Sequence, residues 1–412
     1  MPAPGGSDAL ILLLVGGGLA LGLPHISARD RQRFWHPWVN SGLLPLLIGM
    51  AIGPAFAWPG KSSGWLSLST AETLQPFLAV ALTAAGVLVG TQIRPAHLVA
   101  AGSHFLRRHT RGALLTFCLA AIPGAAFGLL LSSGWAAVAV GGLFGAFAVA
   151  SSQRPLLATE TATEKVTEKV TEKSVGRATE EAADKKAVKI TRHAIVMGQV
   201  VPAGWWNLIA LSLGALALGI GDRPHQGWRS LLLSVALPAA LGLVLGRTAA
   251  GARSRAEAFL FLPAVLTLAG GLALVLGSAP LFTGLVVGVV LANAGRGRAA
   301  LVERSIDELE QPVALAVGLL AGLCLEPQLW SSWAWLAIAV VPVRWLLRTW
   351  WSPTAAALAP LRDRRLAPAS AAGVLLIAGA SLAPQPLPQL VVPLTVALSL
   401  GTLFADVMER RR

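Results

Sequence analysis

Long apolar runs separated by short charged or turn-rich breaks dominate the chain from end to end. A membrane-spanning helix needs roughly 20 mostly apolar residues, and about thirteen runs approach that length. The pattern therefore predicts an all-α membrane protein with about thirteen transmembrane helices. These are expected near residues 8–23, 39–57, 71–91, 112–132, 134–152, 195–219, 229–246, 258–275, 279–294, 309–325, 331–347, 367–383 and 388–406. The first run lacks the charged segment that precedes a cleaved signal sequence, so we expect a permanent helix.

Composition strengthens this prediction. Of the 412 residues, 55% are hydrophobic and only 13% are charged, whereas soluble domains carry about 25% charged residues. The 43 glycines and 26 prolines are also typical, because both residues are commoner in membrane helices than in soluble ones. The two cysteines, Cys118 and Cys324, each lie inside an apolar run. We expect both to be small buried residues rather than metal ligands or redox groups.

The distribution of basic residues predicts the orientation. All of the 33 lysines and arginines except Lys61, Arg223 and Arg229 fall on one side of the alternating loops. By the positive-inside rule that side is cytoplasmic. The N-terminus is then outside and the C-terminus cytoplasmic, in a multi-pass protein of a bacterial inner (plasma) membrane. The net charge of +13 is spread over short loops, so we expect the lipid bilayer, and no nucleic acid, as a partner.

The sequence divides into four segments. Residues 1–152 hold the first five helices, 153–194 form a charged cytoplasmic low-complexity insert, 195–406 hold helices 6–13, and 407–412 form a basic tail. The insert repeats Thr-Glu-Lys-Val and is either a tolerated linker or a regulatory or docking element. Thirteen helices also suit two inverted six-helix repeats with a linking helix between them. Val200-Val201-Pro202 and Val391-Val392-Pro393 are a short echo between helices 6 and 13.

Several short motifs occur in the order and spacing of one transporter family. They are Leu44–Pro54 with its G-x-x-x-G-P ending, Leu74–Leu98, Ala150-Ser151-Ser152-Gln153, Val275–Asn293, and the amphipathic positions Leu301, Glu303 and Ile306. Together they resemble the cation:proton antiporter superfamily, which includes the sodium/hydrogen exchangers and the Kef-type potassium/proton exchangers. The resemblance implies an inverted-repeat sodium/proton antiporter-like fold with broken crossing helices. It also implies exchange of a small inorganic ion, Na⁺ or K⁺, for H⁺ by alternating access, and a homodimer.

The resemblance also places an ion-binding site. It maps onto Ser151, Ser152 and Gln153 at the helix break and onto Gln199, Pro202, Ala203 and Asn207 in the next helix. Members of the family bind the ion with an acidic pair, but here Pro202 and Ala203 stand where the acids are expected. None of the 20 acidic residues falls in the middle of a predicted span. This chain therefore resembles a divergent member without the ion-binding aspartate pair, and it lacks the usual marker of an ion path.

The remaining polar residues leave two functions open. Neutral groups such as Asn207, Thr267, Thr283, Asn293 and Ser381 are either ligands or hydrogen bonds between helices. Arg154 is either the first residue of a cytoplasmic loop or a fixed charge that repels cations and favours an anion. The chain is thus a cation/proton exchanger, or a repurposed exchanger fold: an anion or organic-solute transporter, or a non-transporting partner subunit. All seven histidines lie in loops or at helix edges, so we expect no enzyme, metal site or cofactor.

Overall fold

The computed structural model describes residues 42–53, 68–91, 93, 103–131, 134–150, 209–218, 227–249, 255–294, 300–325, 371–383 and 387–410. All regular structure in these ranges is helical. The elements are α3 (Leu43–Ile52), α4 (Leu68–Thr91), α6 (Ser103–Leu131), α7 (Trp135–Val149), the helical segment Ile209–Leu218, α10 (Gly227–Ala249), α11 (Arg255–Leu276), α12 (Pro280–Ala294), α13 (Ala300–Leu323), α15 (Ala371–Ser381), the 3₁₀ turn η4 (Leu387–Leu390) and α16 (Val391–Arg410).

Every predicted helix that falls on described residues is a helix there, but four ends differ from the prediction. α3 ends at Ile52 rather than near 57. α6 begins at Ser103 rather than near 112. The residues N-terminal to its apolar run are mostly polar, but none of residues 103–111 is a glycine or proline that would interrupt the helix. α13 begins at Ala300 for the same reason, so the amphipathic positions 301–306 belong to it. α16 continues to Arg410, into the expected tail. The predicted helices 8–23 and 331–347 and the insert 153–194 lie outside the described residues.

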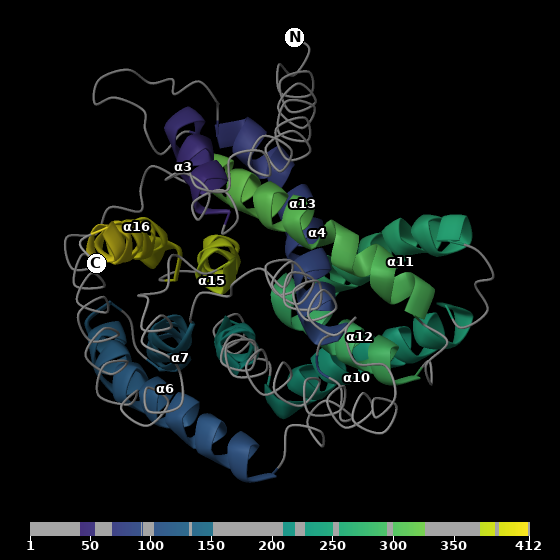
Figure 1. Ribbon diagram of the computed structural model, residues 1–412, viewed down its shortest axis with the longest axis horizontal. Coiled ribbons are helices and arrows are strands. Elements are labelled where there is room, and N and C mark those ends of the chain that lie inside the picture. The colour runs from purple at the N-terminus through teal and green to yellow at the C-terminus, as the bar shows by residue number, and fades with distance from the viewer. Residues whose placement is uncertain are drawn as a thin grey trace, which may run out of the picture.

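The described helices form two groups that meet at α15 (Figure 1). In one group α4 and α12 pack along each other, with α3, α13, α10 and α11 around them. In the other, α6 packs along α7, and α15 and α16 complete the layer. α15 contacts α13 of the first group as well as α7 of the second. One cluster of buried aliphatic and aromatic side chains runs through both groups, so α15 is the element through which they are joined.

The α4–α12 crossing is built on four glycines. Gly86 and Gly90 of α4 lie against Gly284 and Gly288 of α12. A Cβ on Gly90 would lie 2.9 Å from the Cα of Gly288, and a Cβ on Gly284 would overlap the carbonyl oxygen of Thr83. Small residues let helix backbones approach closely, and dispersion contacts then hold helices together without a hydrophobic drive. Glycine is therefore required at this crossing.

The α3–α13 crossing has the same construction. Gly49 of α3 lies against the backbone of Leu319 and Gly322 of α13, and Gly322 in turn lies against the backbone of Leu46 and Met50. The Cβ that alanine would add at Gly322 would stand 2.6 Å from the Met50 nitrogen. The two crossings thus use the same device, in which glycines face the peptide backbone of the partner helix.

A sequence repeat relates the two crossings. Residues 42–53 and 277–288 match at five positions with constant spacing: Gly42/Gly277, Pro45/Pro280, Leu46/Leu281, Gly49/Gly284 and Gly53/Gly288. The first glycine has positive φ in both copies, 73° at Gly42 and 55° at Gly277, so both copies turn into their helix in the same left-handed conformation. α3 and α12 therefore share a sequence pattern and a left-handed glycine before the helix.

α4 and α13 match in the same way, with the spacing changed by one residue. The shared residues are Glu72/Glu308, Gln75/Gln311, Pro76/Pro312, Ala85/Ala321 and Gly86/Gly322. Both prolines lie inside their helices. A third match, Ala-Leu-Ser-Leu-Gly, occurs at 210–214 and at 397–401. Each crossing consequently pairs an element of the first half with one of the second, α4 with α12 and α13 with α3.

Relative helix directions follow from the order of these contacts. Along α4 and α12, Thr83 meets Gly284 and Val87 meets Gly288, so the two helices are parallel; Gly42–Gly318 and Leu46–Gly322 make α3 and α13 parallel too. α6 and α7 are antiparallel, because Gly124 meets Gly141 while Gly128 meets Ala137. In each pair the direction is the one that strict alternation of spans requires. The number of spans and the side on which each end lies remain predictions.

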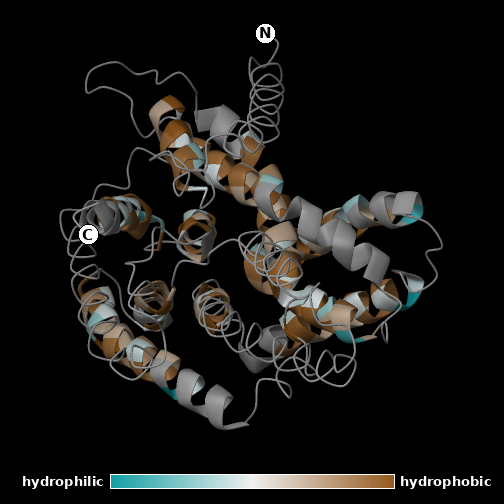
Figure 2. Cartoon of the chain, in the orientation of Figure 1, coloured by the Kyte–Doolittle hydropathy of each residue, from teal (hydrophilic) through white to brown (hydrophobic). Residues whose placement is uncertain are grey.

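Large apolar side chains cover the outward faces of both groups. On α6 these include Ile122, Leu129 and Leu130, which are 69%, 65% and 67% exposed, and on α11 Val275 is 85% exposed. Figure 2 shows hydrophobic residues along most of the described helices. By length and composition, Thr73–Thr91 and Ala113–Leu130 could each cross a membrane, and the other described apolar helices are shorter. Exposed apolar surface of this extent is suited to contact with lipid.

Candidate functional site

The residues that the sequence predicts for an ion site all lie outside the described residues. They are Ser151, Ser152, Gln153, Arg154, Gln199, Pro202, Ala203 and Asn207. The structure does describe the helices that lead to them. α7 ends at Val149, and Ala150 leaves it with a non-helical φ of −53° and ψ of 117°, directly before Ser151. The other segment is described from Ile209 onward, two residues after Asn207.

These two flanking helices lie side by side. Gly142 of α7 faces Ala217, and Ala146 of α7 faces Gly214, so the helices are antiparallel. Ala150 and Ala210, which continue this pairing, are 1% and 0% exposed. The end of α7 that continues into Ser151 and the start of the segment that follows Asn207 therefore lie at the same buried end of one helix pair.

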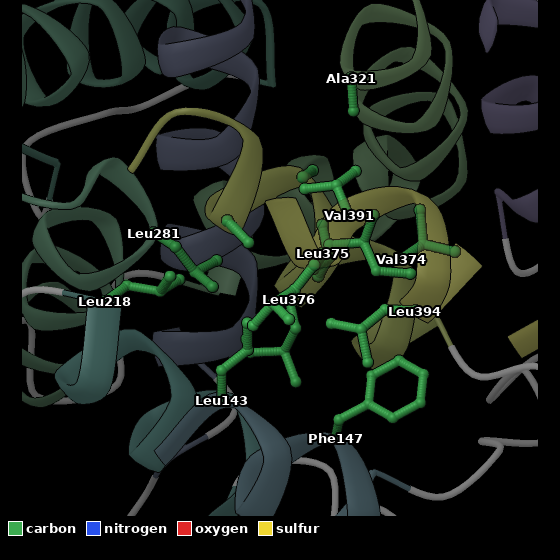
Figure 3. Packing of buried hydrophobic residues seen from close by; sticks show 14 of the residues in the cluster. Leu143, Phe147, Leu218, Leu281, Ala321, Val374, Leu375, Leu376, Val391 and Leu394 are labelled. Carbon is green, nitrogen blue, oxygen red and sulfur yellow. The ribbon is translucent and has the colours of Figure 1, made fainter. Parts of the chain in front are cut away.

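α15 brings a third helix to that end. Leu376 of α15 faces Gly214, and Gly379 of α15 faces Leu218, so α15 runs parallel to the 209–218 segment. Near the start of α15, a Cβ added to Gly373 would lie 3.6 Å from the ring of Phe147. Figure 3 shows Phe147 and Leu143 of α7, Leu376 of α15 and Leu394 of α16 pointing into one apolar cluster. The end of α7 and the starts of the 209–218 segment and of α15 thus converge at one place.

The described part of this region is electrically neutral. The structure describes the backbone of more residues than side chains; among the side chains that it describes, the only acidic or basic ones are Arg111, Arg247 and Glu257, and all three are exposed. No group of three or more His, Cys, Asp and Glu side chains is close enough to hold a metal ion within the described ranges. Any ion binding by these helices would have to use neutral oxygen atoms or residues that the described ranges do not include.

The polar residues that the sequence suggested as bonds between helices behave differently from one another. The hydroxyls of Thr267 and Ser381 donate to carbonyls of their own helices, Pro263 at 2.7 Å and Ala378 at 2.7 Å. The hydrogen bonds of these two hydroxyls stay within their own helices, because the helix itself offers an acceptor one turn back. Asn293 does link two elements, since its side-chain nitrogen donates to the carbonyl of Ile93 at 3.2 Å.

Thr283 forms a buried hydroxyl pair with Ser278. Their oxygens are 2.7 Å apart, and the side chains are 0% and 8% exposed. In the other copy of the repeat, Ile48 and Leu43 occupy the corresponding positions. The crossing can therefore be built without hydroxyls, and the pair is a feature of the second half alone.

The cysteines correct one further expectation. Cys324 is buried as predicted, but Cys118 is exposed. Cys118 lies on the outward face of α6 between Leu115 and Leu119, which are 43% and 47% exposed. An apolar run does not distinguish a face turned to lipid from one turned to protein, so the sequence could not separate the two cysteines.

The glycine crossings were not predicted from the sequence, although a signal for them exists. Gly-x-x-x-Gly occurs in or at the end of each of the four helices, at 49/53, 86/90, 284/288 and 318/322. Hydropathy does not reveal this pattern, because glycine is neither strongly apolar nor polar. A search for the same small-residue spacing in both halves would have found the repeat.

Comparison with known proteins supports the fold. No family model matches the chain, and no curated protein matches it. A solved structure, that of a sodium/proton antiporter from Methanocaldococcus jannaschii, is similar with a TM-score of 0.55 and 15% sequence identity. The similarity covers 97% of this chain and 96% of that chain. The chain therefore has the fold of a cation:proton antiporter, which is a multi-pass helical membrane fold.

Proposed function

We propose that this chain is a secondary transporter that exchanges a monovalent cation, Na⁺ or K⁺, for protons by alternating access. The observation that carries the proposal is the buried place where α7, the 209–218 segment and α15 converge, within an antiporter fold. Both segments predicted to bind the ion join the described helices at that place. Interrupted helices whose ends meet inside the protein are where secondary transporters bind substrate.

The internal repeat supports an inverted-repeat architecture. The matched segments 42–53 and 277–288 belong to the second and ninth predicted spans, which strict alternation directs oppositely across the membrane. The same holds for α4 and α13, the third and tenth spans. A two-fold axis in the membrane plane would exchange the α3–α13 crossing with the α4–α12 crossing, as their shared glycines suggest. Helices 1–6 and 8–13 are then the two repeats.

The proposed site binds the cation with neutral groups. The side-chain oxygens of Ser151, Ser152, Gln153, Gln199 and Asn207 supply dipoles at the helix ends, in place of the carboxylates that Pro202 and Ala203 do not provide. Such ligands offer less charge than carboxylates, so we expect weak cation binding. They also cannot release a proton near neutral pH, so proton coupling has to arise from a group elsewhere along the path.

The test is cation-driven proton movement in proteoliposomes. The purified full-length chain is reconstituted with a pH-sensitive dye, a pH gradient is imposed, and Na⁺, K⁺ or Li⁺ is added. Cation-dependent dissipation that disappears in Asn207→Ala would support the proposal. Asn293→Ala is the matched control, because Asn293 lies at the end of α12 rather than beside the site, and it should retain exchange. No response to any of the cations between about pH 6 and 9 would overturn the exchange function.

A specific observation also favours a second function. Pro202 and Ala203 replace the expected acids, and none of the described side chains in the core carries a charge. With Arg154 next to the predicted helix break, this site would suit an anion or an organic solute better than a cation, or would suit a partner subunit that does not transport. Anion uptake that is lost in Arg154→Gln and kept in Arg247→Gln would select anion transport.

A homodimer in a bacterial inner membrane, with the N-terminus outside and the C-terminus cytoplasmic, completes the proposal. The asymmetry of basic residues between alternate loops supports the orientation. Protease protection of tags placed at either terminus, in intact and in broken spheroplasts, tests the orientation. Crosslinking in native membranes tests the dimer.

A further inference from the structure

α6 is longer than a bilayer requires, and its surplus lies at one end. The helix has 29 residues, about 43 Å at 1.5 Å per residue, whereas the hydrocarbon core is about 30 Å thick. Its apolar stretch is Ala113–Leu130. The first ten residues, Ser103 to Gly112, therefore extend the helix about 15 Å beyond the apolar stretch, into the headgroup region.

In this extension, four basic residues occupy helix positions whose spacing corresponds to one face. His104, Arg107, Arg108 and Arg111 are spaced i, i+3, i+4 and i+7, and positions with that spacing share a face. Arg111, at the end of the series, is exposed. The positive-inside rule alone requires basic residues in this region but does not require them to share a face.

The same face continues into the membrane as an exposed apolar stripe. Four residues after Arg111 comes Leu115, followed on that face by Leu119, Ile122 and Leu129, which are 43%, 47%, 69% and 65% exposed. The opposite face, with Ala113, Ala120 and Phe127 buried, packs against α7. One side of α6 therefore has basic positions near its N-terminus, followed by exposed apolar side chains. This arrangement is complementary to a phospholipid, which has an anionic headgroup followed by acyl chains.

We propose that this face of α6 binds an anionic phospholipid, with the headgroup phosphate at Arg107, Arg108 and Arg111 and the acyl chains along Leu115, Leu119 and Ile122. Anionic lipid surfaces attract basic residues that stand next to a spanning helix, and the attraction is worth about 1 kcal/mol for each one. The site does not depend on the transported ion, so it stands or falls separately from the exchange function.

The test compares lipid binding by the full-length chain in detergent. Native mass spectrometry counts bound phosphatidylglycerol and phosphatidylcholine, and thermal unfolding reports the stabilisation that each gives. Phosphatidylglycerol should be preferred in the parent chain. R107Q/R108Q/R111Q should weaken its binding roughly a hundredfold, about fivefold for each arginine. R247Q/R253Q/R255Q removes the same charge from the α10–α11 end and should keep the preference.

Further arms of the experiment distinguish a lipid site from a site for free anions and from general charge attraction. Equal loss in both triple variants, or equal binding of both lipids by the parent chain, would overturn the proposal. Stabilisation by inorganic phosphate at the same concentration as the lipid would identify a site for free anions instead. If the glutamine variant does not fold, R107K/R108K/R111K preserves the charge and should preserve the preference; its loss there would also count against the proposal.

Cys118 allows a direct check of what covers the apolar stripe. It is exposed on that face, whereas Cys324 is buried, so a nitroxide reagent should label Cys118 selectively, with Cys118→Ser as the control for specificity. In proteoliposomes the label should be accessible to oxygen, which concentrates in lipid, and protected from a water-soluble nickel complex. Protection from both would mean that protein, such as a second copy of this chain, covers the stripe, and the lipid proposal would fail.

Discussion

Replacing Gly284 by alanine would put a methyl group where the carbonyl oxygen of Thr83 already lies. The added Cβ would also stand 3.0 Å from the Thr83 Cα, so backbone rather than a flexible side chain blocks it on this side. α4 and α12 would have to separate along the crossing. Overpacking of this kind typically costs about 1 to 3 kcal/mol. Alanine favours the helix by about 1 kcal/mol over glycine, which hides part of that cost in a single measurement.

Gly271 of α11 provides a reference for the gain in helix propensity when glycine is replaced by alanine. It is helical, and an added Cβ there would meet nothing within 4 Å. Gly271→Ala therefore reports the conformational gain alone. Because both variants gain the same helix propensity, we expect Gly284→Ala to be about 1 to 3 kcal/mol less stable than Gly271→Ala. The free energy of unfolding can be measured by SDS titration of the purified chain in detergent, followed by the fluorescence of its 14 tryptophans.

The repeat extends the prediction to a second site. Gly49 corresponds to Gly284, and a Cβ added there would overlap the carbonyl oxygen of Leu319, as one on Gly284 would overlap that of Thr83. Gly49→Ala should therefore cost about as much as Gly284→Ala. If Gly284→Ala were as stable as Gly271→Ala, close backbone packing at the crossing would be refuted. If only one of the two equivalent glycines were sensitive, the equivalence of the crossings would be refuted.

Three further predictions concern side chains. Phe147 is 2% exposed, so Phe147→Ala should destabilise the chain by about 3 kcal/mol through lost packing. Leu130 is 67% exposed, so Leu130→Ala should change the SDS midpoint little. Ser278→Ala and Thr283→Val should each cost about 1 to 2 kcal/mol by leaving a buried hydroxyl without its partner, while the double variant should cost less than their sum; strict additivity would contradict the hydrogen bond. Asn293→Ala should cost about 1 kcal/mol by removing the bond to Ile93, and an unchanged midpoint would show that this link adds nothing.

Hydrophobic patterning predicted the described helices well, and its errors have a common cause. An apolar run indicates which residues are expected in the hydrocarbon core. A helix continues beyond that run until a residue interrupts its backbone hydrogen bonds. α6 and α13 therefore begin in polar sequence, at Ser103 and Ala300, upstream of the apolar runs. α3 shows the opposite case, because it ends at Ile52, where Gly53 is extended, while the apolar run of the sequence continues.

The candidate site was predicted from a family resemblance rather than from hydrophobic patterning, and its residues lie outside those that the structure describes. Resemblance to an antiporter family located it, and the structure supports the fold and the convergence of the flanking helices at Ala150 and Ala210. The assignment of individual ligands, Asn207 above all, remains a prediction. Sequence reasoning missed the contacts that organise the fold, because they depend on which small residues face each other across chain segments far apart in the sequence.

The repeated glycine crossings have a consequence for how such a chain could arise. Each crossing joins an element of one half to an element of the other, so neither half completes its own packing. Two separate copies of a half-length ancestor, inserted in opposite orientations, would have met through these same glycine faces and formed both crossings at once. Gene duplication and fusion would then have turned a contact between two polypeptides into a contact within one. Under this origin, the two halves can diverge after fusion, as with the hydroxyl pair at Ser278 and Thr283, because a fused chain does not need identical halves.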